Sequence, residues 1–420
     1  MLGLLVMLAL SGTTGAAQTA VGETTAMAPS WSFGGEVRMQ YERFAYEEWG
    51  AEPDDRSGYV LQRVMVRAGR TLGSRAAALV EMKSGLEAGR VGGPRLPDED
   101  RLDLHQGYLD LRAGPAIARL GRQELQFGSA RLVSMRDLNV RQSFDAARVT
   151  LLGRAWRVDA FAGHPATTRA GALDDATDPE RALWGVYGVR QPGGAAVDLY
   201  YLGYRRRSAR FDSVAGPERR HTFGIRLWGL PSALNYNLEV AGQWGAVGDS
   251  RIRAWTVASD TGYQFSFALR PRVGLRADVT SGDRDRHDRT LGTFNAMFPR
   301  GAYFGYIASA GPANHIDLNP HLDLHTGSVV ITAGWLVFWR HERADGIYTM
   351  GGQLLRSGAG TRSLLVGHSP GVGATWRINP RVTVLAHASV FTAGPFVRET
   401  GDTDDSTLFR ASITYRFQDQ

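Results

Sequence analysis

Apolar and polar residues alternate along most of the chain. The alternation is clearest in five segments, at 36–42, 236–244, 272–280, 382–390 and 409–417. A period of two is that of a β-strand, in which successive side chains point to opposite faces. The alternating runs extend over roughly 9–14 residues, whereas strands in soluble sheets are nearer to 5–6 residues. The pattern therefore predicts an all-β protein built from long amphipathic strands.

Long amphipathic strands could form a soluble sandwich or a membrane barrel, and two further features favour the barrel. The face opposite the apolar one is charged, and aromatic residues lie near the segment ends, as in the girdles at membrane interfaces. Those aromatic residues are Trp228, Trp244, Trp255, Tyr263, Trp335, Trp339 and Trp376. A closed sheet also pairs every backbone group internally, as lipid requires. We predict one transmembrane antiparallel β-barrel of roughly 16 to 18 strands. Its lipid-facing residues are expected to include Val240, Val273, Leu275, Ala386 and Ile413.

The connections between strands fall into two groups. Short turns are predicted at 191–194 and 379–381, where Pro and Gly or Asn stand together, as in periplasmic turns. Longer polar connections are expected at the extracellular end. They are predicted at 45–57, 88–101, 126–140, 165–181 and 281–325.

The composition agrees with one large sheet. The 420 residues include 51 Gly, which suits turns and close-packed strands better than helices. No Cys is present, which excludes disulfides, thiolate metal sites and cysteine nucleophiles. Residues 1–17 hold an apolar stretch followed by small residues, which we interpret as a signal peptide. No linker or repeat divides the remainder, so 18–420 is expected to be a single outer-membrane barrel.

The net charge is +6, and Lys83 is the single lysine among 48 basic residues. The arginines are spread evenly rather than gathered in basic runs, which argues against a nucleic-acid partner. Arginine binds carboxylate and phosphate groups through a planar, two-pronged donor. The direction in which the arginines point is therefore central to function.

Two stretches carry motifs beyond composition. The first has GRQEL at 121–125, FG at 127–128, RLV at 131–133, NV at 139–140 and FDAAR at 144–148. The second has SGD at 281–283, LGTFN at 291–295, FPRG at 298–301 and YFG at 303–305. Both resemble the alginate-export family of outer-membrane porins.

The resemblance implies an 18-stranded barrel in the bacterial outer membrane, and a channel rather than an enzyme. It implies passive, anion-selective passage of acidic solutes, such as the anionic exopolysaccharide alginate, through an Arg-lined lumen. A general or small-anion diffusion porin is the alternative, and an outer-membrane hydrolase a more distant one. Expected partners are outer-membrane lipid and lipopolysaccharide, an acidic solute or polyuronate, and periplasmic export proteins. No cofactor is expected.

Candidate pore-lining residues follow from the strand phase and from the motifs. An Arg on the lipid face at mid-membrane costs roughly 2–4 kcal/mol, so arginines opposite apolar neighbours are expected to face inward. The candidates are Arg38, Arg67, Arg122, Arg131, Arg148, Arg276, Asp278 and Arg340. They could form an electropositive ladder for anions. Alternatively, they pair with acids on neighbouring strands and brace the wall.

The 281–325 connection is long enough to be functional. Its candidate gating residues are Phe294, Asn295, Phe298, Arg300, Tyr303 and Phe304. Folded into the barrel, this connection would be a constriction or gate, or else an immobile apolar plug.

Metal and catalytic interpretations are weaker. Asp283, Asp285 and Asp288 are a weak Ca²⁺ candidate, but arginines alternate with them, which favours self-neutralisation. A second metal candidate combines His315, His321 and His325 with Asp317 and Asp323, but the histidine spacings of six and four residues fall in a predicted loop and not on one helix face. Ser389 and His387 share a strand face, yet a spacing of two residues along one strand places them roughly 7 Å apart. No motif supports catalysis there.

Overall fold

A computed structural model describes residues 31–52, 55–96, 98–229, 233–302, 304–307 and 310–418. The expected signal peptide at 1–17 and the candidate Tyr303 lie outside these residues. Of the helices that the model describes, none is long and apolar enough to cross a membrane.

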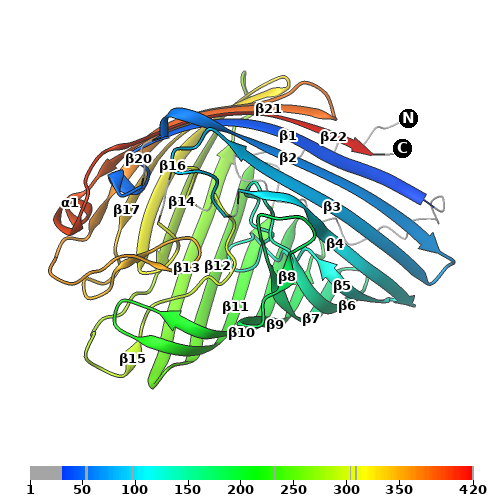
Figure 1. Cartoon of the computed structure of the whole chain (residues 1–420), viewed down its shortest axis with the longest axis horizontal. Helices are drawn as coiled ribbons and strands as arrows, with labels where there is room; N and C mark the ends of the chain where they lie inside the picture. The colour runs from blue at the N-terminus through cyan, green and yellow to red at the C-terminus, as the bar shows by residue number, and fades with distance from the viewer. Residues whose placement is uncertain are drawn as a thin grey trace.

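The described chain forms a closed antiparallel barrel of 18 long strands (Figure 1). Each strand pairs with its neighbour in the chain, and β22 pairs with β1 to close the sheet. The strands are β1 (Trp31–Ala45), β2 (Asp55–Leu72), β3 (Ala76–Ala88), β4 (Asp100–Ala113), β5 (Ala116–Gln123), β6 (Phe144–Leu152), β7 (Trp156–Thr167), β9 (Arg181–Arg190), β10 (Ala195–Arg210), β11 (Ala215–Gly229), β12 (Leu234–Val247), β13 (Ser250–Gln264), β14 (Arg272–Thr280), β16 (His315–Thr326), β17 (Val329–Trp339), β20 (Leu365–Arg377), β21 (Val382–Ala393) and β22 (Ser406–Gln418). The predicted fold is confirmed.

The alternation in the sequence corresponds to the two faces of this sheet. Val240, Val273, Leu275 and Ile413 are exposed on the outside of the barrel, and Ala386 is half-buried. Charged neighbours such as Glu239 point inward and are buried. A sandwich would bury the apolar residues between two sheets, and the closed register excludes that arrangement.

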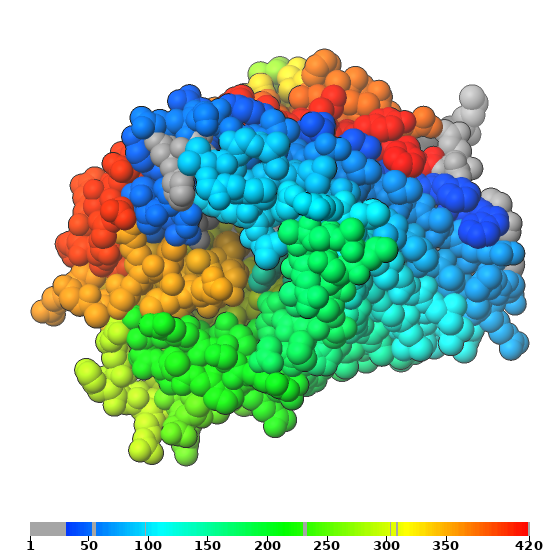
Figure 2. Space-filling model, in the orientation of Figure 1, coloured from blue at the N-terminus to red at the C-terminus, as the bar shows by residue number. Residues whose placement is uncertain are grey.

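The smaller elements lie in the connections at one end of the barrel (Figure 1). They are η1 (Glu47–Gly50), β8 (Ala176–Thr177), β15 (Thr290–Leu291), β18 (Ile347–Tyr348), β19 (Leu354–Arg356) and α1 (Pro395–Thr400). The opposite end has short turns, including those predicted at 191–194 and 379–381. In the space-filling view, the surface is hollowed between the N-terminal strands (blue), the connection near residue 350 (orange) and the strands near residue 200 (green) (Figure 2).

The predicted 281–325 loop is too long, because β16 begins at His315. Ile316, Leu318, Leu322 and Leu324 alternate in this strand, but Pro320 and three histidines obscured the pattern. Pro320 lacks a backbone N–H, and the pairing of β16 with β17 skips its position. The connection therefore covers 281–314, and the three histidines belong to a strand rather than a loop.

Two further corrections concern the connections. The one predicted at 126–140 extends over 124–143, between β5 and β6. Long connections at 340–364 and 394–405 were not anticipated, and they contain the β18–β19 hairpin and α1.

Candidate functional site

The two motif-bearing connections, 124–143 and 281–314, fold inward and meet; we call them the infolded pair. The backbone N–H of Phe298 donates to the carbonyl of Leu132 at 3.0 Å, and that of Arg300 to the carbonyl of Ala130 at 3.0 Å. The Arg136 guanidinium donates to the carbonyl of Met297 at 3.0 Å. The two motifs, separate in the sequence, thus form one structural unit.

The 124–143 connection is anchored to the wall of β1–β3 by Asn139. Its amide nitrogen donates to the carbonyl of Asp98 at 2.8 Å and to that of Gln62 at 3.2 Å. Arg38, on β1, donates to the Asn139 side-chain oxygen at 3.3 Å. Gly85 permits this approach, because a Cβ there would lie 2.7 Å from the Val140 side chain. The asparagine of the motif is therefore a docking residue.

The same connection reaches the opposite wall through Ser129 and Arg131. Ser129 donates to Glu239 of β12 at 2.9 Å. The Arg131 guanidinium lies 3.5 Å from Asp278 of β14 and 3.8 Å from Glu239. The 124–143 connection consequently spans the lumen from β1–β3 to β12–β14.

Asn295 holds the 281–314 connection in place through two reciprocal hydrogen bonds between its backbone and the side chain of Gln243. Its N–H donates to the Gln243 side chain at 3.0 Å, and the Gln243 amide donates back to its carbonyl at 2.8 Å. The Asn295 side chain also donates to Glu218 at 3.1 Å. Buried Arg220 donates to the carbonyl of Thr293 at 3.0 Å. These contacts fix the connection on β11 and β12.

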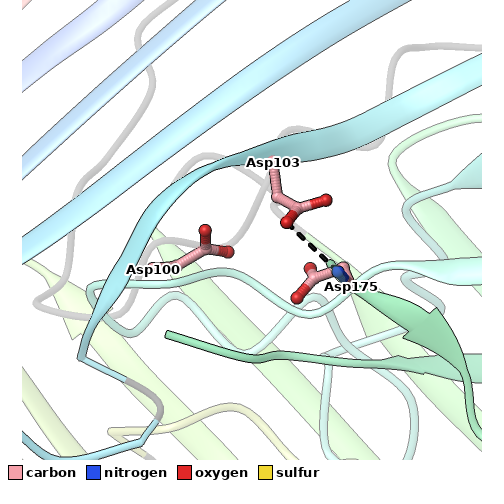
Figure 3. A group of neighbouring side chains, drawn as sticks. All are labelled: Asp100, Asp103 and Asp175. Atoms are coloured by element: carbon pink, nitrogen blue, oxygen red, sulfur yellow. Dashed lines mark hydrogen bonds between the residues drawn. The ribbon is translucent and has the colours of Figure 1, made fainter. Parts of the chain in front are cut away.

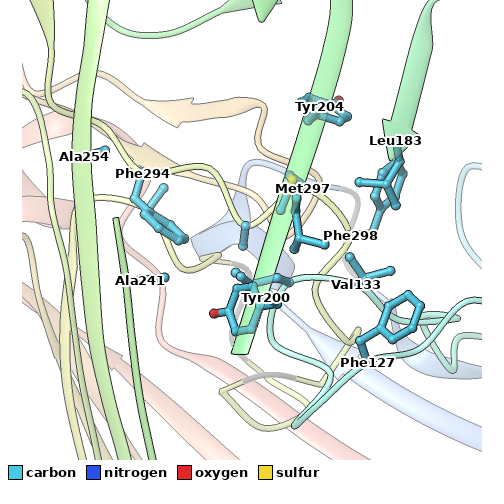
Figure 4. Packing of buried hydrophobic residues seen from close by; sticks show 14 of the residues in the cluster. Phe127, Val133, Leu183, Tyr200, Tyr204, Ala241, Ala254, Phe294, Met297 and Phe298 are labelled. Carbon is cyan, nitrogen blue, oxygen red and sulfur yellow. The ribbon is translucent and has the colours of Figure 1, made fainter. Parts of the chain in front are cut away.

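Aromatic packing completes this attachment (Figure 4). Phe298 is fully buried and meets Phe144 and Tyr204 edge-on, with ring centroids 5.1 and 5.9 Å apart. Phe294 lies in the same cluster, whereas Phe304 packs against His315 with the two rings tilted and their centroids 4.2 Å apart. The candidate gating aromatics that the structure describes, Phe294, Phe298 and Phe304, are thus packed against the wall. Whether they move remains a prediction for experiment.

Arg340 serves the 340–364 connection. It is fully buried and donates to the carbonyls of Arg343, Asp345 and Ser363 at 3.0, 2.8 and 3.1 Å. Its guanidinium lies 4.1 Å from the ring centroid of Phe396 in α1. Because carbonyls and an aromatic ring surround it, Arg340 holds this connection together.

Asp345 ties the 340–364 connection to the infolded pair. Its carboxylate accepts from the Asp283 N–H at 2.9 Å and from the Thr293 hydroxyl at 2.6 Å. The Tyr348 hydroxyl donates to its other oxygen at 2.5 Å. Burial raises the pKa of Asp345 to about 6, against the effect of these donors. The 281–314 and 340–364 connections therefore share one polar junction.

Most other candidate arginines are in ion pairs on neighbouring strands. Arg122 grips Asp145 through two nitrogens at 2.8 and 3.0 Å. Arg148 lies 2.8 Å from Asp159, and Arg276 lies 3.5 Å from Asp260. Such pairs agree with the bracing alternative, since an acid on the neighbouring strand offsets the charge of each arginine.

One side of the lumen carries a group of arginines with fewer acids beside them. It lies where β1, β2 and β22 meet Arg141 of the infolded pair. We call the arginines there the basic wall: Arg38, Arg63, Arg67, Arg141, Arg410 and Arg416. Glu36 alone is shared by three of them: it contacts Arg63, lies 2.8 Å from Arg416 and lies 3.5 Å from Arg141. Arg67 donates to the side chain of Gln418 at 3.3 Å. Within the described residues, neither Arg38 nor Arg67 forms an ion pair with a carboxylate.

Asp137 is the main acid of the infolded pair against this wall. It lies 2.7 Å from Arg63 and 2.8 Å from Arg141. Burial favours the neutral acid, but Arg141, Arg63 and Arg38 together hold the pKa of Asp137 well below its usual range. Sequence reasoning missed Asp137 and Arg141, although both flank the asparagine of the motif.

The weak Ca²⁺ candidates do not converge. Asp285 and Asp288 each accept from a nearby backbone N–H, of His287 at 2.9 Å and of Thr290 at 2.6 Å. In the part of the chain that the structure describes, the close carboxylate group is instead Asp100, Asp103 and Asp175 (Figure 3). Lys83 lies 2.9 Å from Asp100 and 2.8 Å from Asp175, so its ammonium already offsets this group.

The histidines of β16 face the lumen with individual partners. His315 lies 3.4 Å from Asp317, and His321 lies 2.6 Å from a nitrogen of Arg272. Across the described ranges, these residues do not form a group of three ligands close enough for one metal ion. His387 meets the ring of Tyr306, with centroids 5.0 Å apart.

The barrel is closed and has 18 strands, and its long connections fold into a charged lumen. This is the architecture of an outer-membrane porin. The sequence matches the alginate-export family over residues 30–410, and the chain belongs to that family. It is accordingly a channel and not an enzyme.

Solved structures agree on the fold. The chain is similar to OpdO of Pseudomonas aeruginosa (11% identity, TM-score 0.65), with 93% of this chain and 97% of that one covered. It is also similar to OccAB1 of Acinetobacter baumannii (12%, 0.62), with 92% and 96% covered. OccD3 (OpdP) of Pseudomonas aeruginosa gives 13% and 0.61, with 95% and 93% covered. Among curated proteins, none matches the sequence.

Proposed function

We propose that this channel is located in the outer membrane and passes acidic solutes passively and with anion selectivity, including an anionic polyuronate such as alginate. The observation that carries the proposal is the basic wall. It has six arginines and three acids, Glu36, Glu42 and Asp137, and the acids pair with only four of the arginines. Fixed positive charge along a narrow aqueous path raises the local concentration of anions.

The accessible part of the basic wall lies toward the end with short turns. Gly34 of β1 pairs with Arg67 on one side and with Gln418 on the other, and Glu36 pairs with Arg416. The Arg416 side chain is 55% exposed. Arg67 and Arg416 are therefore the first arginines of the basic wall that a solute meets from that end, and carboxylates suit their guanidinium geometry.

A small-anion or general diffusion porin is the second candidate. This candidate is favoured by the ion pairs of Arg122, Arg148 and Arg276. An arginine whose charge is offset by an acid braces the barrel wall, but it does not bind the carboxylates of a polymer.

Reversal potentials across a salt gradient in planar bilayers test the selectivity. The triple variant Arg38→Gln, Arg67→Gln, Arg416→Gln is expected to lower the anion-over-cation preference. The loss should be largest at low salt, where the Debye length reaches about 30 Å at 0.01 M. The matched control is Arg122→Gln with Asp145→Asn, which removes one arginine and its acid together. Equal reversal potentials for the triple variant and the parent would refute the proposal.

Block of conductance by oligouronates separates the two candidates. A polyuronate channel should be blocked at lower concentration by longer oligouronates, because several carboxylates engage the wall at once. A small-anion porin should be blocked equally, per carboxylate, by a monomeric uronate or by vanillate, the compound named with the structure of OpdK.

A further inference from the structure

The outer face of β10–β13 carries a row of arginines near the end that bears the long connections. Arg205 of β10 lies directly opposite Arg219 of β11. Arg219 is followed in the same row by Ala246 of β12 and Arg251 of β13. Arg253 lies one outward position further along β13. All four arginines are exposed.

These four arginines have no ion-pair partner within the described residues. Arg207 differs, because it lies 3.2 Å from Glu180. Like charges placed directly opposite each other on a sheet repel. An anion would therefore stabilise the facing pair Arg205 and Arg219, and the described chain does not supply one there.

An aromatic row lies immediately next to the arginines, on the side of the membrane centre. His221 of β11 pairs with Trp244 of β12, and their rings stack with centroids 5.6 Å apart. The Tyr201 hydroxyl lies 2.6 Å from the His221 ring nitrogen, and Trp184 meets His221 edge-on. Aromatic rows of this kind mark the membrane interface. The arginine row consequently lies at the level of the lipid head groups.

A hollow opens beneath these two rows. It has a volume of about 480 Å³, and the outward side chains of Phe223, Trp244, Arg253 and Trp255 line it. Its floor is Gly242, where a Cβ would meet no atom within 4 Å. Gly242 pairs with Phe223 on one side and with Trp255 on the other, so the missing side chain leaves a gap between two aromatic rings.

We propose that this face is a binding site for lipopolysaccharide, a phosphorylated and multiply acylated glycolipid. Its phosphates would lie on Arg205, Arg219 and Arg251, and one acyl chain would fill the hollow over Gly242. Strands are about 4.8 Å apart, so the row across β10–β13 extends over about 14 Å and accommodates more than one phosphate. The arginine row lies at the level of the head groups and the apolar hollow lies nearer the membrane centre. Phosphates and acyl chains follow each other in the same order in this lipid. The site faces away from the lumen and is independent of the transported solute.

Native mass spectrometry of the folded barrel in detergent, with added lipid A, tests the proposal. The parent is expected to bind one lipid A, and dephosphorylated lipid A should bind at least tenfold more weakly. Exchanging Arg205, Arg219, Arg251 and Arg253 for Gln should weaken lipid A binding at least tenfold. Gly242→Leu should weaken hexa-acylated lipid A but leave the bisphosphorylated sugar without acyl chains unaffected.

The matched control exchanges four exposed arginines at the other end of the barrel for Gln: Arg112, Arg154, Arg190 and Arg377. A heat-modifiable gel band checks folding of each variant, and single-channel conductance should be unchanged in all of them. Parent-like lipid A binding by the folded quadruple variant would overturn the proposal. An equal loss in the control set would also overturn it, because it would reveal attraction by net charge alone.

Discussion

Asp278 and Asp317 face each other directly across β14 and β16, and both are buried. Arg131 reaches Asp278, whereas neither carboxylate oxygen of Asp317 has a hydrogen-bond partner within the described residues. Opposed carboxylates repel each other. The two facing carboxylates thus lower the stability of the barrel at the point where the 124–143 connection meets the wall.

Asp317→Asn is expected to stabilise the barrel by up to about 1 kcal/mol, since it removes the repulsion and keeps the shape. Urea unfolding in detergent micelles measures this. Asp323→Asn on the same strand is the control, because Asp323 is equally buried but lies 3.2 Å from Arg272. It should be destabilising, and stabilisation by both exchanges would contradict the argument.

Asp137 gives a prediction about pH. A carboxyl whose pKa is lowered on folding contributes stability above its unfolded pKa of about 3.9, and loses it only as the pH falls through the lowered value. The pKa of Asp137 is held well below its usual range. The attachment of 124–143 should therefore persist unchanged from pH 7 to pH 4.5.

Asp137→Asn should loosen this attachment at every pH in that range. Conductance noise at pH 7 and pH 4.5 reports it: the parent should be equally quiet at both values and the variant noisier at both. A parent that becomes noisy only at pH 4.5 would show that another group controls the attachment.

At the scale of elements, the long strands were predictable because alternation is a local property. β16 was missed since Pro320 and its histidines break that pattern, although its pairing with β14 is continuous. The docking of Asn139 on β2 and β3 could not be predicted. It depends on which connections turn inward, and no local pattern encodes that. The two sequence motifs did single out the connections 124–143 and 281–314, which fold inward.

The 281–314 connection closes on itself at the wall, because Thr280 and His315 are paired residues of β14 and β16. A short Gly-Ser linker can therefore replace 283–313 without distorting the barrel. We expect the replacement to raise single-channel conductance and small-solute leak, since it removes a connection that folds into the lumen. Conductance in bilayers and liposome swelling measure this.

Shortening the connection at 394–405 by a similar linker is the control, because α1 packs on the neighbouring strands β20 and β21. An unchanged conductance after removal of 283–313, with the barrel still heat-modifiable, would show that this connection does not restrict the path.

At the scale of the whole molecule, closure by β1 and β22 defines the fold. Tyr41 and Ala411 are direct partners on the outer face. Opposed residues in antiparallel strands have Cα atoms about 4.5–5.5 Å apart, within the range that a disulfide bridges. The chain has no Cys of its own, so any engineered pair is unambiguous.

Tyr41→Cys with Ala411→Cys should form a disulfide in nearly all molecules, and the denatured oxidised chain should migrate faster on gels than the reduced one. Tyr41→Cys with Ala386→Cys should not, because β21 lies one strand further away, about 10 Å from β1. An open sheet would cross-link neither pair.

The seam between β1 and β22 also makes the order of the strands cyclic. Gly34 lies beside Gln418, so the two ends of the barrel's chain are neighbours at the edge with short turns (Figure 1). A circular permutant, in which a linker joins these ends and the chain is cut inside 340–364, would contain every strand pair of the parent. The architecture itself therefore has no first strand.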